Sequence, residues 1–179
     1  MAKLILVTGA ARSGKSEWAE QLATDSEKSV IYIATAQENP DDREWQARIE
    51  KHRSRRPESW KTRSVPVELK EAIVNSTASD CLLIDSLGTW LANLLDQSET
   101  EWLETLETLL QSFEQTESLI IFVAEETGWG VVPAYPIGRV FRDRLGNLTR
   151  RIGVIADTVY LVTGGHTLNL SQIGTPLKN

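Results

Sequence analysis

The chain has 179 residues, which is the size of one ordinary domain and enough to bury a sizeable core, so we expect a single domain over residues 1–179. Its formal net charge of −6 argues against a nucleic acid or an anionic membrane surface as the main partner. No stretch approaches the roughly 18 apolar residues of a spanning helix. The N-terminus is predicted to form a strand and a glycine-rich loop where a signal peptide needs its apolar region, so we expect a cytoplasmic protein.

Short apolar runs alternate with longer amphipathic stretches along the chain. This alternation predicts an α/β fold, in which helices flank a mostly parallel sheet. Strands are predicted at residues 4–8, 30–34, 62–65, 81–84, 119–123 and 158–162, followed by an antiparallel edge strand at 167–170 after the Gly164-Gly165 turn. Helices are predicted at residues 15–23, 42–53, 67–74, 89–95, 99–113 and 138–155.

The first predicted strand is followed directly by the phosphate-binding pattern G-x-x-x-x-G-K-[ST]. The pattern consists of Gly9, Ala10, Ala11, Arg12, Ser13, Gly14, Lys15 and Ser16. In such a loop, backbone N–H groups point at phosphate oxygens, the lysine reaches the β- and γ-phosphates, and the serine hydroxyl can ligate Mg²⁺. The rival dinucleotide-binding fingerprint needs glycine at its third position, where this chain has Ala11. We therefore expect a nucleoside triphosphate as ligand and a P-loop NTPase-like (RecA-like) fold.

Arginine residues cluster around one histidine in the segment 41–57. If the segment is helical, Trp45, Ile49 and His52 share one face. An imidazole is largely neutral at pH 7, and positive charge nearby favours that form, so His52 could attack phosphorus in a site that attracts phosphate. The spacing also fits a histidine that ends a helix on a solvated basic face and stabilises the helix dipole.

Asp85 ends the apolar run of the predicted strand at 81–84. Ligands of open α/β sheets bind at the carboxyl ends of the strands, where a carboxylate can hold the Mg²⁺ that bridges phosphates. An aspartate there could instead cap the following helix. Residues 85–88 also fit the D-x-x-G of switch GTPases, but no N-K-x-D guanine-reading motif follows downstream.

Two adjacent carboxylates, Glu125 and Glu126, follow the predicted strand at 119–123, and Trp129 stands between two glycines shortly after them. This composition suits a loop that grips the substrate and orients a hydroxyl or a metal. The alternative is a plain glycine-containing connection whose tryptophan packs against the protein.

With these motifs in place, the chain resembles the bifunctional adenosylcobinamide kinase/adenosylcobinamide-phosphate guanylyltransferase family of cobalamin assembly. The resemblance runs nearly end to end. Beside Thr8 and the phosphate-binding pattern, it rests on Tyr32-Ile33-Ala34-Thr35-Ala36, Arg48-Ile49, His52-Arg53, Arg56-Pro57, Trp60 with Thr62, Asp85, Trp90-Leu91, Asn93, Glu126, Gly128-Trp129-Gly130, Val132-Pro133, Phe141-Arg142-Asp143, Ala156-Asp157 and Tyr160-Leu161-Val162.

The resemblance implies two reactions. ATP or GTP phosphorylates the aminopropanol hydroxyl of adenosylcobinamide, and GMP then passes from GTP to the new phosphate through a GMP-histidine intermediate. His52 matches the family's R-I-x-x-H-R histidine. The expected catalytic residues are Lys15, His52 and Glu126, the expected Mg²⁺ ligands are Ser16 and Asp85, and further nucleotide contacts are expected at Ala34, Thr35, Ala36, Arg53, Ser54, Arg55 and Arg56. The family also suggests a homotrimer.

Three parts of the chain depart from the family's common pattern. Ser64 stands where many members carry an acidic residue, which affects a guanine contact. Glu125 lies in Ala124-Glu125-Glu126 where Thr-Asn-Glu is common, and Thr149 replaces an asparagine; both changes concern the corrinoid or kinase side. Two alternatives stay open: a P-loop kinase of a small molecule that does not need His52, and a nucleotide-responsive binding protein without transfer chemistry.

Overall fold

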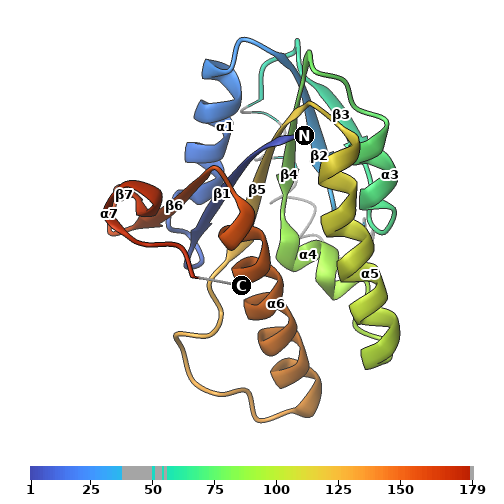
Figure 1. The fold of residues 1–179 in the computed structure, drawn as a ribbon. Helices are drawn as coiled ribbons and strands as arrows, with labels where there is room; N and C mark the ends of the chain where they lie inside the picture. Colours follow the sequence, from blue (N-terminus) through green and yellow to red (C-terminus); the bar gives the residue numbers. More distant parts are fainter. Residues whose placement is uncertain (38–49, 51–53, 55, 178–179) are drawn as a thin grey trace.

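The computed structural model describes residues 1–37, 50, 54 and 56–177. Seven strands form one sheet in the order β3-β2-β4-β5-β1-β6-β7 (Figure 1). Neighbouring strands pair in parallel, except in the β6–β7 hairpin at one edge. The strands are β1 (Lys3–Gly9), β2 (Ser29–Ala34), β3 (Lys61–Ser64), β4 (Asp80–Asp85), β5 (Leu119–Glu125), β6 (Thr158–Thr163) and β7 (His166–Asn169). The predicted α/β fold, with a mostly parallel sheet and an antiparallel C-terminal edge, is confirmed.

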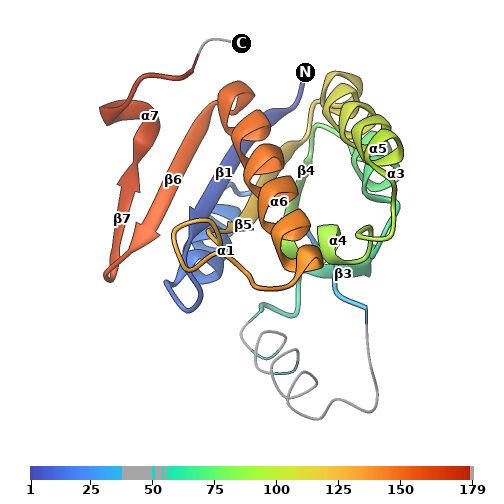
Figure 2. The same cartoon turned by 90° about the horizontal axis from the view of Figure 1, so that it is seen from below.

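Helices cover both faces of the sheet (Figures 1 and 2). They are α1 (Lys15–Asp25), α3 (Leu69–Val74), α4 (Leu87–Ala92), α5 (Glu99–Ser112), which continues into the 3₁₀ turn η1 (Phe113–Gln115), α6 (Pro136–Ile155) and α7 (Leu170–Ile173). The short α7 was not predicted, and the predicted helix at 42–53 lies outside the described residues, apart from a helical Glu50. In the part of the chain that the structure describes, no helix is long and apolar enough to cross a bilayer.

Successive side chains of the central strands point to opposite faces of the sheet and build two cores. One core contains Leu6, Ile84 and Phe122 and is closed by α3, α4, α5 and α6. The other contains Val7 and Val123, and α1 covers it. Because both faces are buried, these strands read in sequence as continuous apolar runs.

Helix α4 begins two residues earlier than predicted. Ser86 is its N-cap: the Ser86 hydroxyl accepts a hydrogen bond from the Thr89 backbone N–H at 3.3 Å, and the Thr89 hydroxyl accepts one from the Ser86 N–H at 3.1 Å. The N-terminus of α4 is therefore capped by Ser86, and the preceding Asp85 stays at the end of β4 with its carboxylate available for another role.

Four adjacent strands end side by side at one edge of the sheet. In the register of the sheet, Gly9 pairs with Glu125, Val123 with Asp85, and Asp85 with Ala34. The loops that follow β1, β5, β4 and β2 therefore begin next to one another. This is the edge at which open α/β sheets bind their ligands.

Candidate active site

The phosphate-binding pattern forms the turn between β1 and α1. Gly9 ends β1 against the backbone carbonyl of Val162 on β6, so close that a Cβ at this position would collide with it. Gly14 is the N-cap of α1 and has φ +94°, a left-handed conformation that glycine adopts without steric cost. The glycines thus let the chain turn sharply into α1, whose first backbone N–H groups have no partner within the helix and can bind an anion.

Lys15 and Ser13 give this turn the polar groups of a phosphate site. The Lys15 side chain is buried, and its Nζ donates to the Ala10 carbonyl at 3.2 Å, which bends the side chain back over the loop. The Ser13 hydroxyl is buried and has no hydrogen-bond partner among the described residues. A buried hydroxyl without a partner and a lysine with one long hydrogen bond both fit a site completed by phosphate oxygens.

Asp85 is held by its neighbour on β2. The hydroxyl of Tyr32 donates to Asp85 Oδ2 at 3.0 Å, and burial together with the Asp85 charge raises the pKa of Tyr32 well above its ordinary value. The hydroxyl therefore stays protonated and remains a donor. The guanidinium of Arg56 lies over the Tyr32 ring, 3.8 Å from its centroid, and also donates to Thr62 Oγ1 at 3.2 Å.

The donor set at this edge fits Mg²⁺. The ion takes oxygen ligands and is commonly bound by one or two protein groups together with substrate phosphates. Ser16 at the start of α1 and Asp85 at the end of β4 provide a hydroxyl and a carboxylate. The described residues contain no cluster of three or more His, Cys, Asp or Glu side chains that would hold a metal by themselves. One hydroxyl and one carboxylate leave the other ligand positions of such an ion to substrate phosphates and water.

A network of hydrogen bonds joins Ser86, the residue after Asp85, to Thr35 and Glu125. The Thr35 hydroxyl accepts from the Ser86 N–H at 2.9 Å and donates to the Ser86 carbonyl at 2.8 Å. Glu125 accepts from the Ser86 hydroxyl at 2.5 Å and from the Gly88 N–H at 3.1 Å. Glu125 therefore accepts from one of the backbone N–H groups at the N-terminus of α4 that have no partner within the helix, and it holds the segment that carries Asp85 in place. The neighbouring Glu126 contacts Thr8 instead.

Two of the residues expected to contact the nucleotide accept hydrogen bonds within the protein through their backbone carbonyl groups. The Ala34 carbonyl accepts from the Val65 N–H at 2.8 Å, and the Thr35 carbonyl accepts from Asn93 Nδ2 at 2.8 Å. Ala36, half-buried, follows directly. The segment 34–36 is thus bonded to the residues that directly follow β3 and α4, at the same edge of the sheet as the phosphate loop.

Gly88→Ala tests the hydrogen-bond network around Ser86. A Cβ at this position would lie 2.9 Å from Glu125 Cδ and closer still to a carboxylate oxygen, so the carboxylate would have to leave the N-terminus of α4. We expect the free energy of unfolding to fall by about 1–2 kcal/mol, although alanine has the better helix propensity. Gly146→Ala is the control, because nothing lies within 4 Å of that Cβ in α6; it should gain roughly 0.5–1 kcal/mol. Equal urea midpoints for the two variants would contradict this role of Glu125.

Glu126 lies beside the phosphate loop. Its Oε1 accepts from the Thr8 hydroxyl at 2.7 Å, and its backbone N–H donates to the Gly9 carbonyl at 3.0 Å. The side chain is half-buried, so one carboxylate oxygen is engaged while the group stays partly open to solvent.

Trp129, shortly after Glu126, is 68% exposed. Within the described structure, this exposure excludes the alternative in which the ring packs against the protein.

Several expected site residues fall outside the described residues: His52, Arg53 and Arg55. From the same segment the structure describes an exposed Ser54 and the half-buried Arg56. Sequence reasoning did not select Tyr32 as a site residue, although a tyrosine inside an otherwise aliphatic strand next to Asp85 is a usable signal.

Two of the departures from the family pattern also have a place in the fold. Ser64 ends β3 and pairs with Ala34, so it lies at the nucleotide edge of the sheet. Thr149 lies in α6, and its hydroxyl is buried without a hydrogen-bond partner among the described residues.

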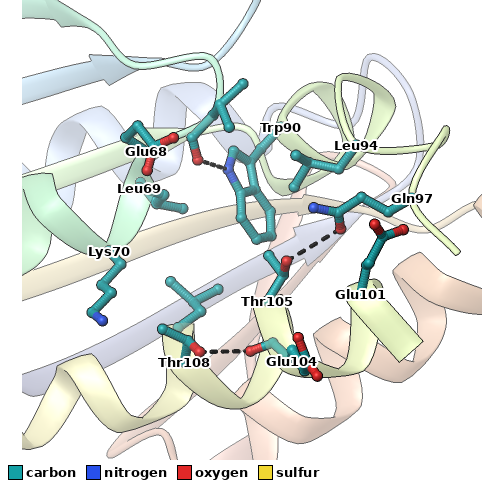
Figure 3. Close-up of a pocket in the computed structure, with 12 residues that line it drawn as sticks. Glu68, Leu69, Lys70, Trp90, Leu94, Gln97, Glu101, Glu104, Thr105 and Thr108 are labelled. Atoms are coloured by element: carbon teal, nitrogen blue, oxygen red, sulfur yellow. Dashed lines mark hydrogen bonds between the residues drawn. The ribbon is translucent and has the colours of Figure 1, made fainter. Parts of the chain in front are cut away.

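A cavity of about 400 Å³ lies between α3, α4 and α5 (Figure 3). Its apolar lining includes Leu69, Trp90, Leu94 and Leu109, and its polar lining includes Glu68, Glu101 and Glu104. The indole N–H of Trp90 donates a hydrogen bond to the Val67 carbonyl at 2.9 Å. None of the expected site residues lines this cavity, so it is separate from the phosphate loop.

By sequence, the chain is similar to proteins named for adenosylcobalamin biosynthesis. The model of the family described as "Cobinamide kinase / cobinamide phosphate guanyltransferase" matches residues 5–170. The bifunctional adenosylcobalamin biosynthesis protein CobP of Pseudomonas aeruginosa is 40% identical over 174 residues, covering 96% of this chain and 98% of the relative. The protein CobU of Escherichia coli, described in the same words, is 36% identical over 177 residues, covering 90% and 96%.

Solved structures share the fold at much lower identity. An ATPase from the type III secretion system of pathogenic bacteria superimposes with a TM-score of 0.55 and 11% identity, covering 96% of this chain and 53% of that one. This likeness concerns the fold alone, and it agrees with the P-loop NTPase-like architecture seen here.

Proposed function

This chain belongs to the cobinamide kinase / cobinamide phosphate guanyltransferase family, and we propose that it catalyses both reactions on adenosylcobinamide. ATP or GTP phosphorylates the aminopropanol hydroxyl, and GMP from GTP is then attached to the new phosphate, giving adenosylcobinamide-GDP. The observation that carries this proposal is the meeting of the phosphate loop, Asp85 and Glu126 at one sheet edge in a chain of this family.

The phosphate loop would serve both reactions. The N-terminus of α1 offers backbone N–H groups, and Lys15 would exchange its 3.2 Å bond to Ala10 for a phosphate oxygen. Ser16 and Asp85 would hold Mg²⁺, which neutralises phosphate charge when bound. The Tyr32 hydroxyl keeps the Asp85 carboxylate oriented.

Glu126 is the proposed catalytic carboxylate of the kinase reaction. The hydroxyl oxygen of the acceptor attacks the γ-phosphorus, the bond to the bridging oxygen breaks, and ADP or GDP leaves. Glu126 orients the hydroxyl and takes its proton. The bond from Thr8 supports this role, because it fixes the carboxylate next to the point where β1 enters the phosphate loop.

Glu126→Gln should lower kcat of the kinase reaction by about a hundredfold or more, because the amide cannot accept the proton. Transfer of GMP to chemically prepared adenosylcobinamide phosphate should change little. Glu117→Gln is the matched control, since Glu117 is exposed and precedes β5 at the opposite edge of the sheet. Unchanged kinase turnover in Glu126→Gln would remove Glu126 from the catalytic residues.

His52 is the proposed nucleophile of the guanylyl transfer. A ring nitrogen attacks the α-phosphorus of GTP and pyrophosphate leaves. A phosphate oxygen of adenosylcobinamide phosphate then attacks the same phosphorus, the P–N bond breaks, and the histidine is regenerated. The contact of Arg56 with Tyr32 supports this proposal, because it brings the end of the segment that carries His52 close to Asp85.

Separate measurement of the two products tests the proposed function. Adenosylcobinamide with ATP should give the phosphate, and addition of GTP should give adenosylcobinamide-GDP. Formation of the phosphate alone would indicate a monofunctional kinase. We also propose that the chain assembles as a homotrimer, which light scattering would detect as three times the 20.0 kDa chain mass.

A further inference from the structure

An exposed apolar loop follows Glu126 and leads to α6. Charged residues make up 25% of the sequence, yet residues 127–137 contain none. In this apolar loop (residues 127–137), Trp129 is 68% exposed, Val131 94% and Tyr135 77%, and Val132 and Ile137 are exposed as well. A concentration of large apolar side chains on the surface of one loop is typical of a binding surface.

Contacts from the first turn of α6 hold the C-terminal half of this loop in place. The Arg139 guanidinium donates to the carbonyls of Pro133 at 3.0 Å and Ala134 at 2.7 Å. The Gly138 N–H donates to the Tyr135 carbonyl at 3.1 Å, and a Cβ at Gly138 would lie 2.8 Å from the Pro133 Cβ. The outward position of Tyr135 is therefore built into the turn that starts α6.

The apolar loop is continuous with the candidate active site. It begins one residue after Glu126, which is bonded to Thr8 and Gly9 where β1 enters the phosphate loop. Figure 1 shows this segment leaving the end of β5 and extending beyond the edge of the sheet before it returns to α6. A ligand bound to this loop can thus extend a side chain to the phosphate loop.

We propose that the apolar loop binds the corrin ring of the acceptor, with Trp129 and Tyr135 as its main contacts; this rests on the function proposed above. The acceptor hydroxyl has to reach the γ-phosphate at Lys15, while the bulky macrocycle stays outside. An uncharged surface with two aromatic rings suits the flat ring better than it suits a nucleotide, whose phosphates need cationic groups.

The loop then contributes to catalysis through binding at a distance from the reacting atoms. Contacts with the ring hold the flexible aminopropanol arm near Glu126, which reduces the entropy that the reaction must lose. Removal of such a contact should weaken acceptor binding without affecting the nucleotide.

Trp129→Ala and Tyr135→Ala test the proposal, with Leu103→Ala on α5 as an exposed apolar control. Cobinamide absorbs visible light, so its binding can be measured by ultrafiltration without nucleotide. We expect Trp129→Ala to raise the Kd and the KM for cobinamide about tenfold, Trp129→Phe to recover most of the loss, and the KM for ATP to stay unchanged. Leu103→Ala should behave like the wild type.

Unchanged cobinamide binding in both loop variants would overturn the proposal. So would a fall in oligomer mass by light scattering with unaltered cobinamide binding, because the loop would then contact a second copy. If the loop variants bound cobinamide more weakly but the wild-type protein transferred no phosphate, the proposed role of the loop would be supported and the proposed function contradicted.

Discussion

Lys15→Ala is expected to lower the rates of both proposed reactions about a hundredfold or more. Both proposed reactions would draw on one phosphate loop, and the lysine of this motif is expected to bring its cation to the β- and γ-phosphates. Loss of one such contact costs on the order of 3 kcal/mol of transition-state stabilisation. Initial rates of phosphorylation and of GMP transfer, each at saturating nucleotide, measure the effect.

Lys70→Ala is the matched control, because it removes the same charge from an exposed position on α3. It should leave both rates near those of the wild type. Urea unfolding of Lys15→Ala shows whether the buried side chain also supports the fold. Turnover like that of the wild type in Lys15→Ala would mean that the phosphate loop is not where the reactions occur.

His52→Ala is expected to separate the two reactions. Transfer of GMP should fall at least about a thousandfold, because the variant lacks the nitrogen that is proposed to attack the α-phosphorus. The kinase reaction should continue near the wild-type rate, since phosphoryl transfer to a hydroxyl needs positioning, charge neutralisation and a carboxylate. Adenosylcobinamide phosphate and adenosylcobinamide-GDP are quantified separately in the same samples.

The second histidine provides the control. His166 begins β7, is exposed, and its Nδ1 lies 2.9 Å from the Gly164 carbonyl. His166→Ala should retain both reactions. If His52→Ala lost both products while it still bound GTP and unfolded at the wild-type midpoint, His52 would have a shared or structural role and the proposed division would be wrong.

The sequence predicted the sheet well because its signals are local. Strands such as β4 and β5 are buried on both faces, so each appears as an uninterrupted apolar run. The phosphate-binding pattern is contiguous, and its glycines and lysine occupy the turn that the pattern requires. The predicted helix at 42–53 stays a prediction.

Contacts between distant residues could not be predicted in the same way. Tyr32 and Asp85 meet because β2 and β4 are neighbours, which depends on the order of the strands. Glu125 and Glu126 look equivalent in sequence, yet the first accepts from the Gly88 N–H in the first turn of α4 and the second accepts from the Thr8 hydroxyl. Successive side chains leave the end of β5 on opposite sides. The exposure of Trp129 likewise depends on the path of the whole loop.

The most direct test of the GMP-histidine intermediate uses GTP labelled at the α-phosphate. The protein is incubated with this GTP and Mg²⁺, without acceptor, and is then separated by denaturing electrophoresis. We expect label on the wild type and on His166→Ala that acid removes and base does not, as for a phosphoramidate, and none on His52→Ala. Label that persists on His52→Ala, or that maps to Lys51, would contradict the proposed intermediate.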